Sequence, residues 1–482
     1  MRLSELESRL PRPESRNYRA EILALRKRFP LRIVVLDDDP TGIQTVYGCR
    51  LYTTWDVATI REALDAPEGF FYLLLNSRSL PAAEASRRCR EAAAAVAAAA
   101  REKELRLLIV SRSDSTLRGH FPLEPETIRK ALRTSGRRVS GLLPFCPALF
   151  EAGRYTWGDV QYVEQQDQLT PAHLTEFARD AVFGYSGAGL IDYVAEKSGG
   201  KIRKEEVASI GVEELRTSSP PAVGRRLRAA AAKPCLILNA VAYADLYKLA
   251  FALLSFQVEE ACDLVVRSSS SFVPAAVGLA LRDLLLPEEL FAAAGKTGSL
   301  PAGCRRGLVV VGSYVGKSGE QLASLLEWER SAGIEIDVRA LAAGKTLPVP
   351  ALADRARRAW EDKKLPVFYT TRQEIRSPDK AKQLRFGEMI AETLVRLVQS
   401  LSFSPDFMIV KGGISSHVIL SRGLGAASAR VLGQIAPGVP VVLPDSGGLK
   451  DSGEGQSFPF VVFPGNVGSR NTLREIAEVL ST

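Results

Sequence analysis

The sequence predicts an α/β protein with two α/β domains, mostly parallel sheets and an active-site cleft between the domains. The first observation is length, because 482 residues exceed what one hydrophobic core usually organises. The second is a set of eleven short apolar runs without polar alternation, which is typical of buried parallel strands. The third is the helical composition of longer segments between these runs.

Each apolar run is expected to form a strand that stops at a polar residue, a glycine or a proline. The runs occupy residues 33–36, 71–75, 107–110, 141–143, 235–238, 264–266, 308–311, 367–370, 407–410, 439–443 and 458–463. A further short strand is expected at 189–193, and residues 81–105 and 318–333 are expected to be helical. Ligands of such folds bind outside the carboxyl ends of the strands, so the segments after the runs are the candidate site loops.

A stretch rich in Gly, Pro and Ser at residues 295–307 separates the two sets of runs. We expect the domain boundary there, because linkers between domains have this composition. The expected organisation is an N-terminal helical extension at 1–30, a first domain at 31–295 and a second domain at 305–482.

Composition and charge argue against several classes of protein. The 46% hydrophobic and 24% charged residues match a soluble globular chain. Without 18 consecutive apolar residues or an apolar leader, the sequence favours a cytoplasmic protein with no membrane partner. The 6 cysteines and 3 histidines show no metal-binding spacing, so no protein metal ligand is expected. The net charge of +8 is dispersed without interleaved aromatic residues, which favours solvated helix faces over a nucleic-acid partner.

Three adjacent carboxylates follow the run at 33–36. The segment Asp37-Asp38-Asp39-Pro40-Thr41-Gly42 places them in one turn with a hydroxyl and a glycine. Three neighbouring negative charges repel, so a partly buried cluster needs cations or bound hydroxyl groups. Its position at the end of a buried strand favours a functional role over a solvated turn.

Arginines and hydroxyls follow the next two runs. Residues 76–79 read Asn-Ser-Arg-Ser, and residues 111–119 contain Arg112, Asp114 and Arg118. Guanidinium groups are planar forks that bind carboxylates or phosphates. If these loops meet the aspartates at one sheet edge, they form a pocket for an anionic ligand with several hydroxyl groups.

The second half carries glycine-rich strand ends. They are Gly312-Ser313, the segment 411–417 (Lys-Gly-Gly-Ile-Ser-Ser-His) and the segment 464–468 (Pro-Gly-Asn-Val-Gly). Glycines let backbone N–H groups approach phosphate oxygens closely, so three such loops favour a nucleotide. The nearby Gly-Lys-Ser at 316–318 is not a P-loop, because three residues rather than four separate Gly312 from Gly316.

Together these motifs resemble the four-carbon acid sugar kinase family, nearly end to end. The family's Asp-Asp-x-Thr-Gly, Ser-Arg-Ser and Asp-Ser-Thr-x-Arg/Lys-Gly patterns occur here in that order, and its Pro...Gly-Arg segment and Gly-Ser strand end follow. The matching residues are Asp38, Asp39, Thr41, Gly42, Ser77 to Ser79, Asp114 to Thr116, Arg118, Gly119, Pro147, Gly153, Arg154, Gly312 and Ser313. Its Gly-Gly-Glu-Thr-Ser-Gly and Lys-Ser-Gly-Asn-Phe-Gly loops fall on 412–417 and 463–468, where Ile414, His417 and Phe463-Pro464 depart from the pattern.

The resemblance implies a kinase that uses ATP and Mg²⁺ to phosphorylate a hydroxyl of a sugar acid such as threonate, erythronate or an oxo-tetronate. It implies catalytic roles for Asp38 and Asp39. It implies sugar-acid binding by Asp37, Thr41, Gly42, Ser77, Arg78, Ser79, Asp114, Ser115, Thr116, Arg118 and Arg154. It implies nucleotide binding by Ser313, Gly412, Gly413, Ile414, Ser415, Ser416, Gly465 and Asn466.

Three alternatives stay open at this point. One is a non-catalytic sensor of the same fold that binds a sugar acid and a nucleotide. The others are a nucleic-acid-binding protein drawn by the positive charge, and a conventional P-loop kinase that depends on Lys317. The sequence also leaves open the acceptor and the oligomeric state, a homodimer included.

Overall fold

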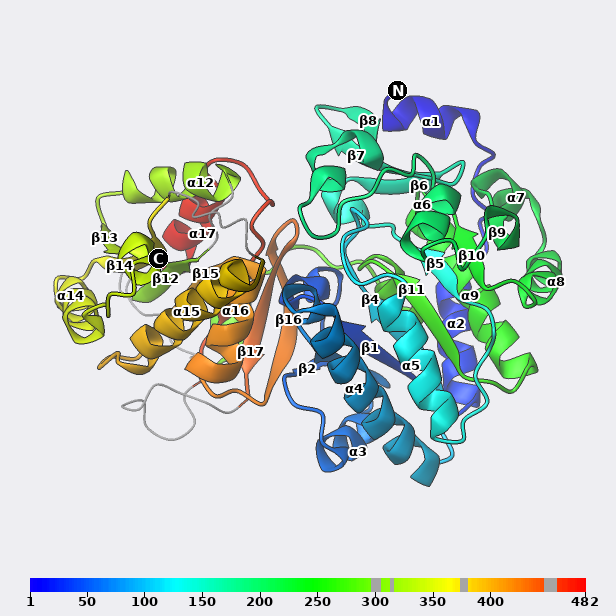
Figure 1. The fold of residues 1–482 in the computed structure, drawn as a ribbon, viewed down its shortest axis with the longest axis horizontal. Helices are drawn as coiled ribbons and strands as arrows, with labels where there is room; N and C mark the ends of the chain where they lie inside the picture. Colours follow the sequence, from blue (N-terminus) through cyan, green and yellow to red (C-terminus); the bar gives the residue numbers. More distant parts are fainter. Residues whose placement is uncertain (296–304, 313–315, 373–379, 446–456) are drawn as a thin grey trace. The chain divides into compact units, whose positions relative to one another are not determined.

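The computed structural model describes residues 1–295, 305–312, 316–372, 380–445 and 457–482, without the side chains of 380–385. The chain forms two compact units, Met1–Arg282 and Asp283–Thr482. Each is an α/β unit (Figure 1), as the sequence predicts.

The first unit contains a parallel sheet with strand order β2-β3-β1-β4-β11-β5-β10-β9. Its strands are β1 (Leu31–Asp37), β2 (Arg50–Tyr52), β3 (Phe70–Leu74), β4 (Arg106–Arg112), β5 (Pro144–Cys146), β9 (Val207–Ile210), β10 (Cys235–Leu238) and β11 (Leu264–Ser268). The central strands are buried along almost their whole length, which explains why they read as continuous apolar runs.

Helices cover this sheet and include both helices of the N-terminal segment. They are α1 (Leu3–Arg9), α2 (Tyr18–Arg28), α3 (Val57–Asp65), α4 (Ala82–Glu102), α5 (Leu123–Thr134), α6 (Leu190–Lys197), α7 (Val212–Thr217), α8 (Pro220–Ala230), α9 (Tyr243–Glu259) and α10 (Phe272–Val277). The alanines of α4 are mostly buried, so α4 lies close to the strands and to α5. Arg19 and Arg26 of α2 donate to the carbonyls of Gly278 and Val277, which ties the N-terminal extension to this unit.

A separate antiparallel sheet in the first unit joins β6 (Arg154–Trp157), β7 (Val160–Gln165) and β8 (Gln168–Pro171). The apolar runs did not predict it, because its strands alternate between buried and partly exposed residues.

The second unit has strand order β13-β14-β12-β15-β18-β17-β16, parallel from β13 to β18 and antiparallel beyond. The strands are β12 (Gly307–Val311), β13 (Ser331–Ile336), β14 (Leu365–Thr370), β15 (Phe407–Lys411), β16 (Ser428–Ala436), β17 (Val439–Pro444) and β18 (Phe460–Phe463). The helices are α11 (Pro287–Ala293), α12 (Gly316–Leu326), α13 (Val338–Ala342), α14 (Val349–Glu361), α15 (Lys380–Gln399), α16 (Gly413–Val418) and α17 (Thr472–Leu480).

Several local expectations differ from the structure. Residues 189–193 lie mostly in helix α6, because Leu190, Tyr193 and Val194 recur at helical spacing and enter the core. The helix expected at 318–333 ends at Leu326, and residues 331–333 form the start of the edge strand β13 instead. The run at 141–143 directly precedes β5 rather than forming it.

The boundary between the two units lies between Arg282 and Asp283, before the glycine-rich stretch at 295–307. Helix α11, which that stretch would assign to the first domain, belongs to the second unit. Its Leu290 and Phe291 lie in that unit's core.

Over the described ranges, no helix combines the length and apolar character needed to cross a bilayer.

Candidate functional site

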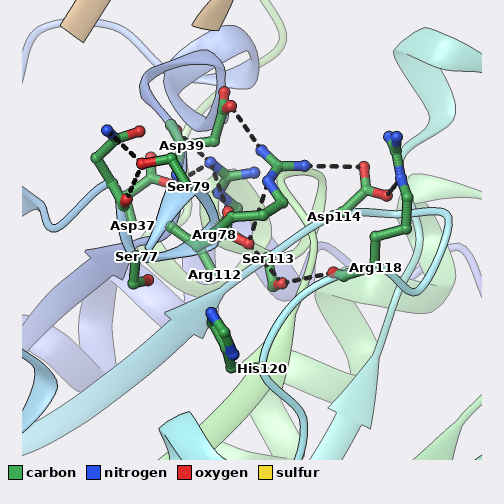
Figure 2. Close-up of polar contacts among 12 residues, drawn as sticks. Asp37, Asp39, Ser77, Arg78, Ser79, Arg112, Ser113, Asp114, Arg118 and His120 are labelled. Atoms are coloured by element: carbon green, nitrogen blue, oxygen red, sulfur yellow. Dashed lines mark hydrogen bonds and ion pairs between the residues drawn. The ribbon is translucent and has the colours of Figure 1, made fainter. Parts of the chain in front are cut away.

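Strand β1 lies at the point where the strand order of the first unit reverses. It pairs with β3 on one side and with β4 on the other, so the carboxyl ends of these three strands are neighbours. Open α/β sheets bind ligands at such a switch point. The three loops that follow β1, β3 and β4 carry the predicted sugar-acid residues other than Arg154, and the structure brings them together (Figure 2).

Asp37 ends β1 and forms a buried ion pair with Arg112, its register partner at the end of β4. Burial raises the pKa of Asp37 to about 7, although the positive charge of Arg112 acts to lower it. Gly42 lies in the 3₁₀ helix η1 (Pro40–Thr45), where an added Cβ would lie 2.2 Å from Asp37 Oδ2 and 2.1 Å from Arg112 Nε. Glycine is therefore needed at position 42 for η1 to pass over this pair.

Asp38 is buried between two donors. Ser113 Oγ donates to its Oδ2 at 2.8 Å, and Arg112 Nη2 lies 3.3 Å from its Oδ1. Oδ1 accepts no hydrogen bond within the described part of the chain. Asp38 thus presents a buried carboxylate oxygen that can still accept a hydrogen bond.

Asp39 caps η1. Its Oδ1 accepts from the Thr41 backbone N at 2.8 Å and from the Thr41 hydroxyl at 2.5 Å. Burial raises its pKa, but Arg78, Arg112 and the two Thr41 bonds outweigh burial and lower the pKa below its ordinary value. Asp39 is therefore ionised at neutral pH.

Arg78 links all three loops (Figure 2). It lies in η2 (Ser77–Ser79), with its nitrogens 2.8 Å from Asp39 Oδ2, 3.6 Å from Asp38 Oδ2 and 3.4 Å from Asp114 Oδ1. Burial alone would lower its pKa, but these carboxylates raise it above the usual value. A substrate carboxylate at Arg78 would compete with three carboxylates of the protein.

The predicted hydroxyl residues also bond within the protein. Ser77 Oγ donates to Glu124 Oε1 at 2.5 Å, and Arg267 Nη1 donates to Glu124 Oε2 at 2.9 Å. Ser79 Oγ donates to the Asn76 carbonyl, Thr116 Oγ1 donates to Asp114, and the Ser115 carbonyl accepts from Gln161. These bonds hold the loops in place around the arginines and aspartates.

Arg118 and Arg154 lie over the same aromatic ring. Their guanidinium carbons are 5.1 Å and 5.7 Å from the ring centre of Phe177, in the 3₁₀ helix at Glu176–Arg179. Arg118 Nε donates to Asp114 Oδ2 at 2.7 Å, whereas the buried Nε of Arg154 has no hydrogen-bond partner among the described residues. Burial lowers the pKa of Arg154. Arg154 is therefore the guanidinium of this cluster that is best placed to receive an outside anion.

In the second unit the strand order reverses at β12, which pairs with β14 on one side and with β15 on the other. The ends of β12, β15 and β18 are neighbours, with Gly312 N donating to the Lys411 carbonyl at 3.2 Å and Gly412 N to the Phe463 carbonyl at 2.8 Å. Gly412 has φ +116°, which side-chain-bearing residues rarely adopt. The structure thus brings the predicted glycine-rich strand ends together at one edge of the sheet.

The other predicted nucleotide residues lie just beyond these ends. Helix α16 contains Gly413, Ile414, Ser415 and Ser416, and Ile414 is 52% exposed. Ser416 Oγ donates to the carbonyls of Val410 and Gly412, which closes the turn from β15 into α16. Gly465 and Asn466 follow β18, and the Gly465 carbonyl accepts from Ser318 Oγ at 3.0 Å. Ser313 lies outside the described residues.

The structure adds residues that the sequence did not assign to a site. Arg267 and Lys411 each stand where an apolar run ends, so the rule that predicted the other site residues, Arg112 among them, could have found them. Glu124 and Phe177 follow no such run, and their contacts depend on the fold. Over the described ranges, no group of three or more His, Cys, Asp or Glu could hold a metal ion.

Comparison with known proteins assigns a class to each unit. Residues 33–276 match a family described as the sugar-binding N-terminal domain, and residues 308–473 match one described as the nucleotide-binding C-terminal domain. A 3-oxo-tetronate kinase of Cupriavidus necator is 27% identical over 431 residues, which is 83% of this chain and 85% of that protein.

Two solved structures share the fold. Haemophilus influenzae protein HI1011 matches with a TM-score of 0.58 and 17% identity over 93% of this chain and 100% of its own. A Salmonella typhimurium LT2 protein matches with a TM-score of 0.61 and 17% identity over 92% of this chain and 98% of its own. At this identity the likeness concerns the fold alone.

Proposed function

We propose that this chain, which belongs to the four-carbon acid sugar kinase family, transfers the γ-phosphoryl group of ATP to a hydroxyl of a four-carbon sugar acid. The acceptor is of the threonate, erythronate or oxo-tetronate type. The similarity to a 3-oxo-tetronate kinase supports this class of acceptor. The match of residues 308–473 to a nucleotide-binding domain supports a nucleotide as the phosphoryl donor.

The observation that carries the proposal is the presence in the first unit of two oppositely charged groups that can each make a further hydrogen bond, Asp38 after β1 and Arg154 at the start of β6. Nε of the Arg154 guanidinium has no hydrogen-bond partner among the described residues. The same is true of the carboxylate oxygen Oδ1 of Asp38. A sugar acid has the complementary groups, a carboxylate for Arg154 and hydroxyls for the aspartates.

Asp38 is the proposed acceptor of the hydroxyl proton. The acceptor oxygen bonds to the γ-phosphorus, the bond from that phosphorus to the β-phosphate oxygen breaks, ADP leaves, and the proton passes to Asp38. Arg112 and Ser113 fix the orientation of Asp38. Asp39 and Asp114 hold Arg78 between them and can accept from other hydroxyls of the acid.

In the second unit, the proposed nucleotide contacts are Gly412 and Gly413 at the start of α16, Ser415 and Ser416 within it, and Gly465 and Asn466 after β18. An added Cβ at Gly312 would lie 2.0 Å from Ser415 Oγ, so β12 and α16 approach closely only because that residue is glycine. Such glycine turns leave room for phosphate oxygens near backbone N–H groups.

Magnesium fits this scheme as a companion of the nucleotide. Mg²⁺ is usually bound by one or two carboxylates together with the phosphates of the substrate, and its charge neutralises those phosphates during transfer. The described residues offer no cage of three ligands. Asp39 and Asp114, both ionised, could supply single carboxylate contacts.

The test is ADP release by the full chain with ATP, magnesium and a panel of four-carbon sugar acids. Each acid is compared with the polyol of the same stereochemistry that lacks the carboxylate. We expect ADP release with at least one acid and at least tenfold less with its polyol, about the value of one charged hydrogen bond. Binding of an acid and of ATP without ADP release would instead identify the sensor, and absence of both would overturn the proposal.

A further inference from the structure

Lys411 is a fully buried lysine at the end of β15 in the second unit. Its Nζ donates to the Pro464 carbonyl at 2.8 Å and lies 3.5 Å from the Gly465 carbonyl. The same nitrogen lies 4.0 Å from the ring centre of Phe463, its register partner on β18. Lys411 therefore reaches across the strand end into the loop that follows β18.

This lysine lacks the partner that buried lysines usually have. Buried ammonium groups are normally paired with a carboxylate, because removing an unpaired charge from water is costly. Within the described ranges no carboxylate lies at ion-pair distance from Lys411. The charged groups that act on it are Lys317, in the first turn of α12, and Arg372, which follows β14.

The three cations come from neighbouring parts of one sheet edge. Strands β14, β12 and β15 are adjacent, and α12 follows β12. Arg372 lies against the start of α12, since a Cβ added at Gly319 would be 3.6 Å from its Nη2. Like charges that repel one another at a strand end are stabilised when an anion binds between them.

We propose that Lys411, Lys317 and Arg372 together bind the phosphate groups of the nucleotide, and that Lys411 turns from the carbonyls of Pro464 and Gly465 to a phosphate oxygen. The inference rests on the proposed function and assigns residues that the glycine loops alone did not.

Binding of a phosphate to Lys411 is expected to be coupled to the uptake of a proton by this lysine. Burial, together with smaller contributions from repulsion by Lys317 and Arg372, lowers the pKa of Lys411 to about 7. A phosphate raises the pKa of a lysine that it contacts, so Lys411 is only partly protonated before binding and fully protonated afterwards. Nucleotide affinity must then fall as the pH rises above the pKa of the free protein, because the proton becomes harder to supply.

The test is calorimetric titration of the full chain with Mg-ADP at about pH 6 and about pH 8.5, in buffers of different ionisation enthalpy, to count protons taken up. For the wild type we expect uptake of most of one proton at the higher pH and little at the lower. In Lys411→Met we expect no uptake and affinity at least about tenfold weaker at the lower pH, the loss of one charged contact. Lys411→Arg should bind well without proton uptake, since arginine stays charged.

The controls separate a phosphate contact from a structural role. Adenosine, which has no phosphate, should bind Lys411→Met and the wild type equally, and Lys345→Met, an exposed lysine of the same unit, should behave as the wild type with Mg-ADP. Three results would overturn the inference. Lys411→Met could take up as many protons as the wild type, or it could lose affinity for adenosine and for ADP to the same degree. The third is an affinity for ADP that is unchanged in Lys317→Met. Absence of nucleotide binding by the wild type would also overturn the proposed function, whereas the other outcomes leave it standing.

Discussion

Both units have a point at which the strand order reverses, but the charged residues at these two points are arranged differently. At the ends of β1, β3 and β4, Arg78, Arg112 and Arg118 face carboxylates of the protein at 3.4 Å or less. The ends of β12, β14 and β15 carry Gly312, Gly412 and the cations Arg372 and Lys411. Nζ of the buried Lys411 contacts the carbonyls of Pro464 and Gly465 and the ring of Phe463. Most charges of the first site are paired before any ligand arrives, with Arg154 as the exception. Lys411 of the second site, by contrast, contacts carbonyls and a ring and no carboxylate of the described residues.

This contrast suits the two ligands of a kinase. A paired network of arginines and aspartates is rigid, because moving one member breaks contacts with several others, and it orients hydroxyl groups without collapsing around them. A buried lysine without a carboxylate partner among the described residues gains most from a ligand with negative charges, and a nucleotide brings several. Substitutions in the first site should therefore affect turnover and the fold, and those in the second should affect nucleotide affinity and its pH dependence.

The largest effect is expected for Asp38→Asn. The amide cannot take the proton from the acceptor hydroxyl, so turnover should fall by about 10²–10⁴-fold, the usual value of general base catalysis. Affinity for Mg-ADP should stay within about threefold of the wild type, since Asp38 belongs to the first unit. Steady-state ADP release and calorimetry measure the two quantities.

The matched control for this substitution is Asp167→Asn. Asp167 is exposed in the β7–β8 turn, with φ +59°, a conformation that asparagine accepts. It should leave turnover unchanged. If Asp38→Asn also kept full turnover, Asp38 would not be the base, and the paired network would have only a structural role.

Gly42→Ala tests how rigid the paired network is. The new methyl group would overlap the Asp37–Arg112 pair, so either η1 moves or a buried ion pair separates, at an expected cost of about 3–5 kcal/mol in the free energy of unfolding. Gly224→Ala, in helix α8 where an added Cβ meets nothing closer than 3.9 Å, should be neutral or stabilise by up to about 1 kcal/mol. Urea unfolding followed by circular dichroism compares them. Equal stability of both variants would contradict a rigid site.

Arg154→Met tests where the acid's carboxylate binds. We expect KM for the sugar acid to rise about 10–100-fold with a smaller change in kcat, because a charge-assisted hydrogen bond is lost in both ground and transition state. The preference for the acid over its matching polyol should disappear in this variant. The exposed Arg203→Met is the control. If the preference survived in Arg154→Met and vanished in Arg78→Met, the carboxylate would bind at Arg78.

The sequence alone indicates the arrangement of the first site's residues more fully than that of the second's, for a physical reason. Asp37 to Asp39, Arg78 and Asp114 all follow buried strands, and the parallel sheet places such ends together without further information. Phe177 lies far from these loops in the sequence, and Glu124 follows no apolar run, so only the fold reveals that they meet Arg154 and Arg267. The role proposed for Lys411 depends on the register of β15 with β18, which puts its side chain over Phe463 rather than in solvent.

The smallest effect is expected in stability, and it follows from the same lysine. The pKa of Lys411 is about 7 in the folded chain and should return to its ordinary value near 10.5 on unfolding, so between these values the unfolded chain binds more protons. The free energy of unfolding of the wild type should then rise with pH relative to Lys411→Met, by at most about 1.4 kcal/mol per pH unit. Below pH 7 both states are protonated and the difference should become constant, with the wild type at its least stable relative to the variant.

Urea unfolding of the two proteins at intervals from about pH 6 to about pH 9 measures this difference directly, and effects of all other titrating groups cancel. Lys345→Met should give a difference that does not change with pH. Parallel curves for the wild type and Lys411→Met would mean that the lysine stays charged in the folded chain, and the second site would then hold its full positive charge before any nucleotide binds.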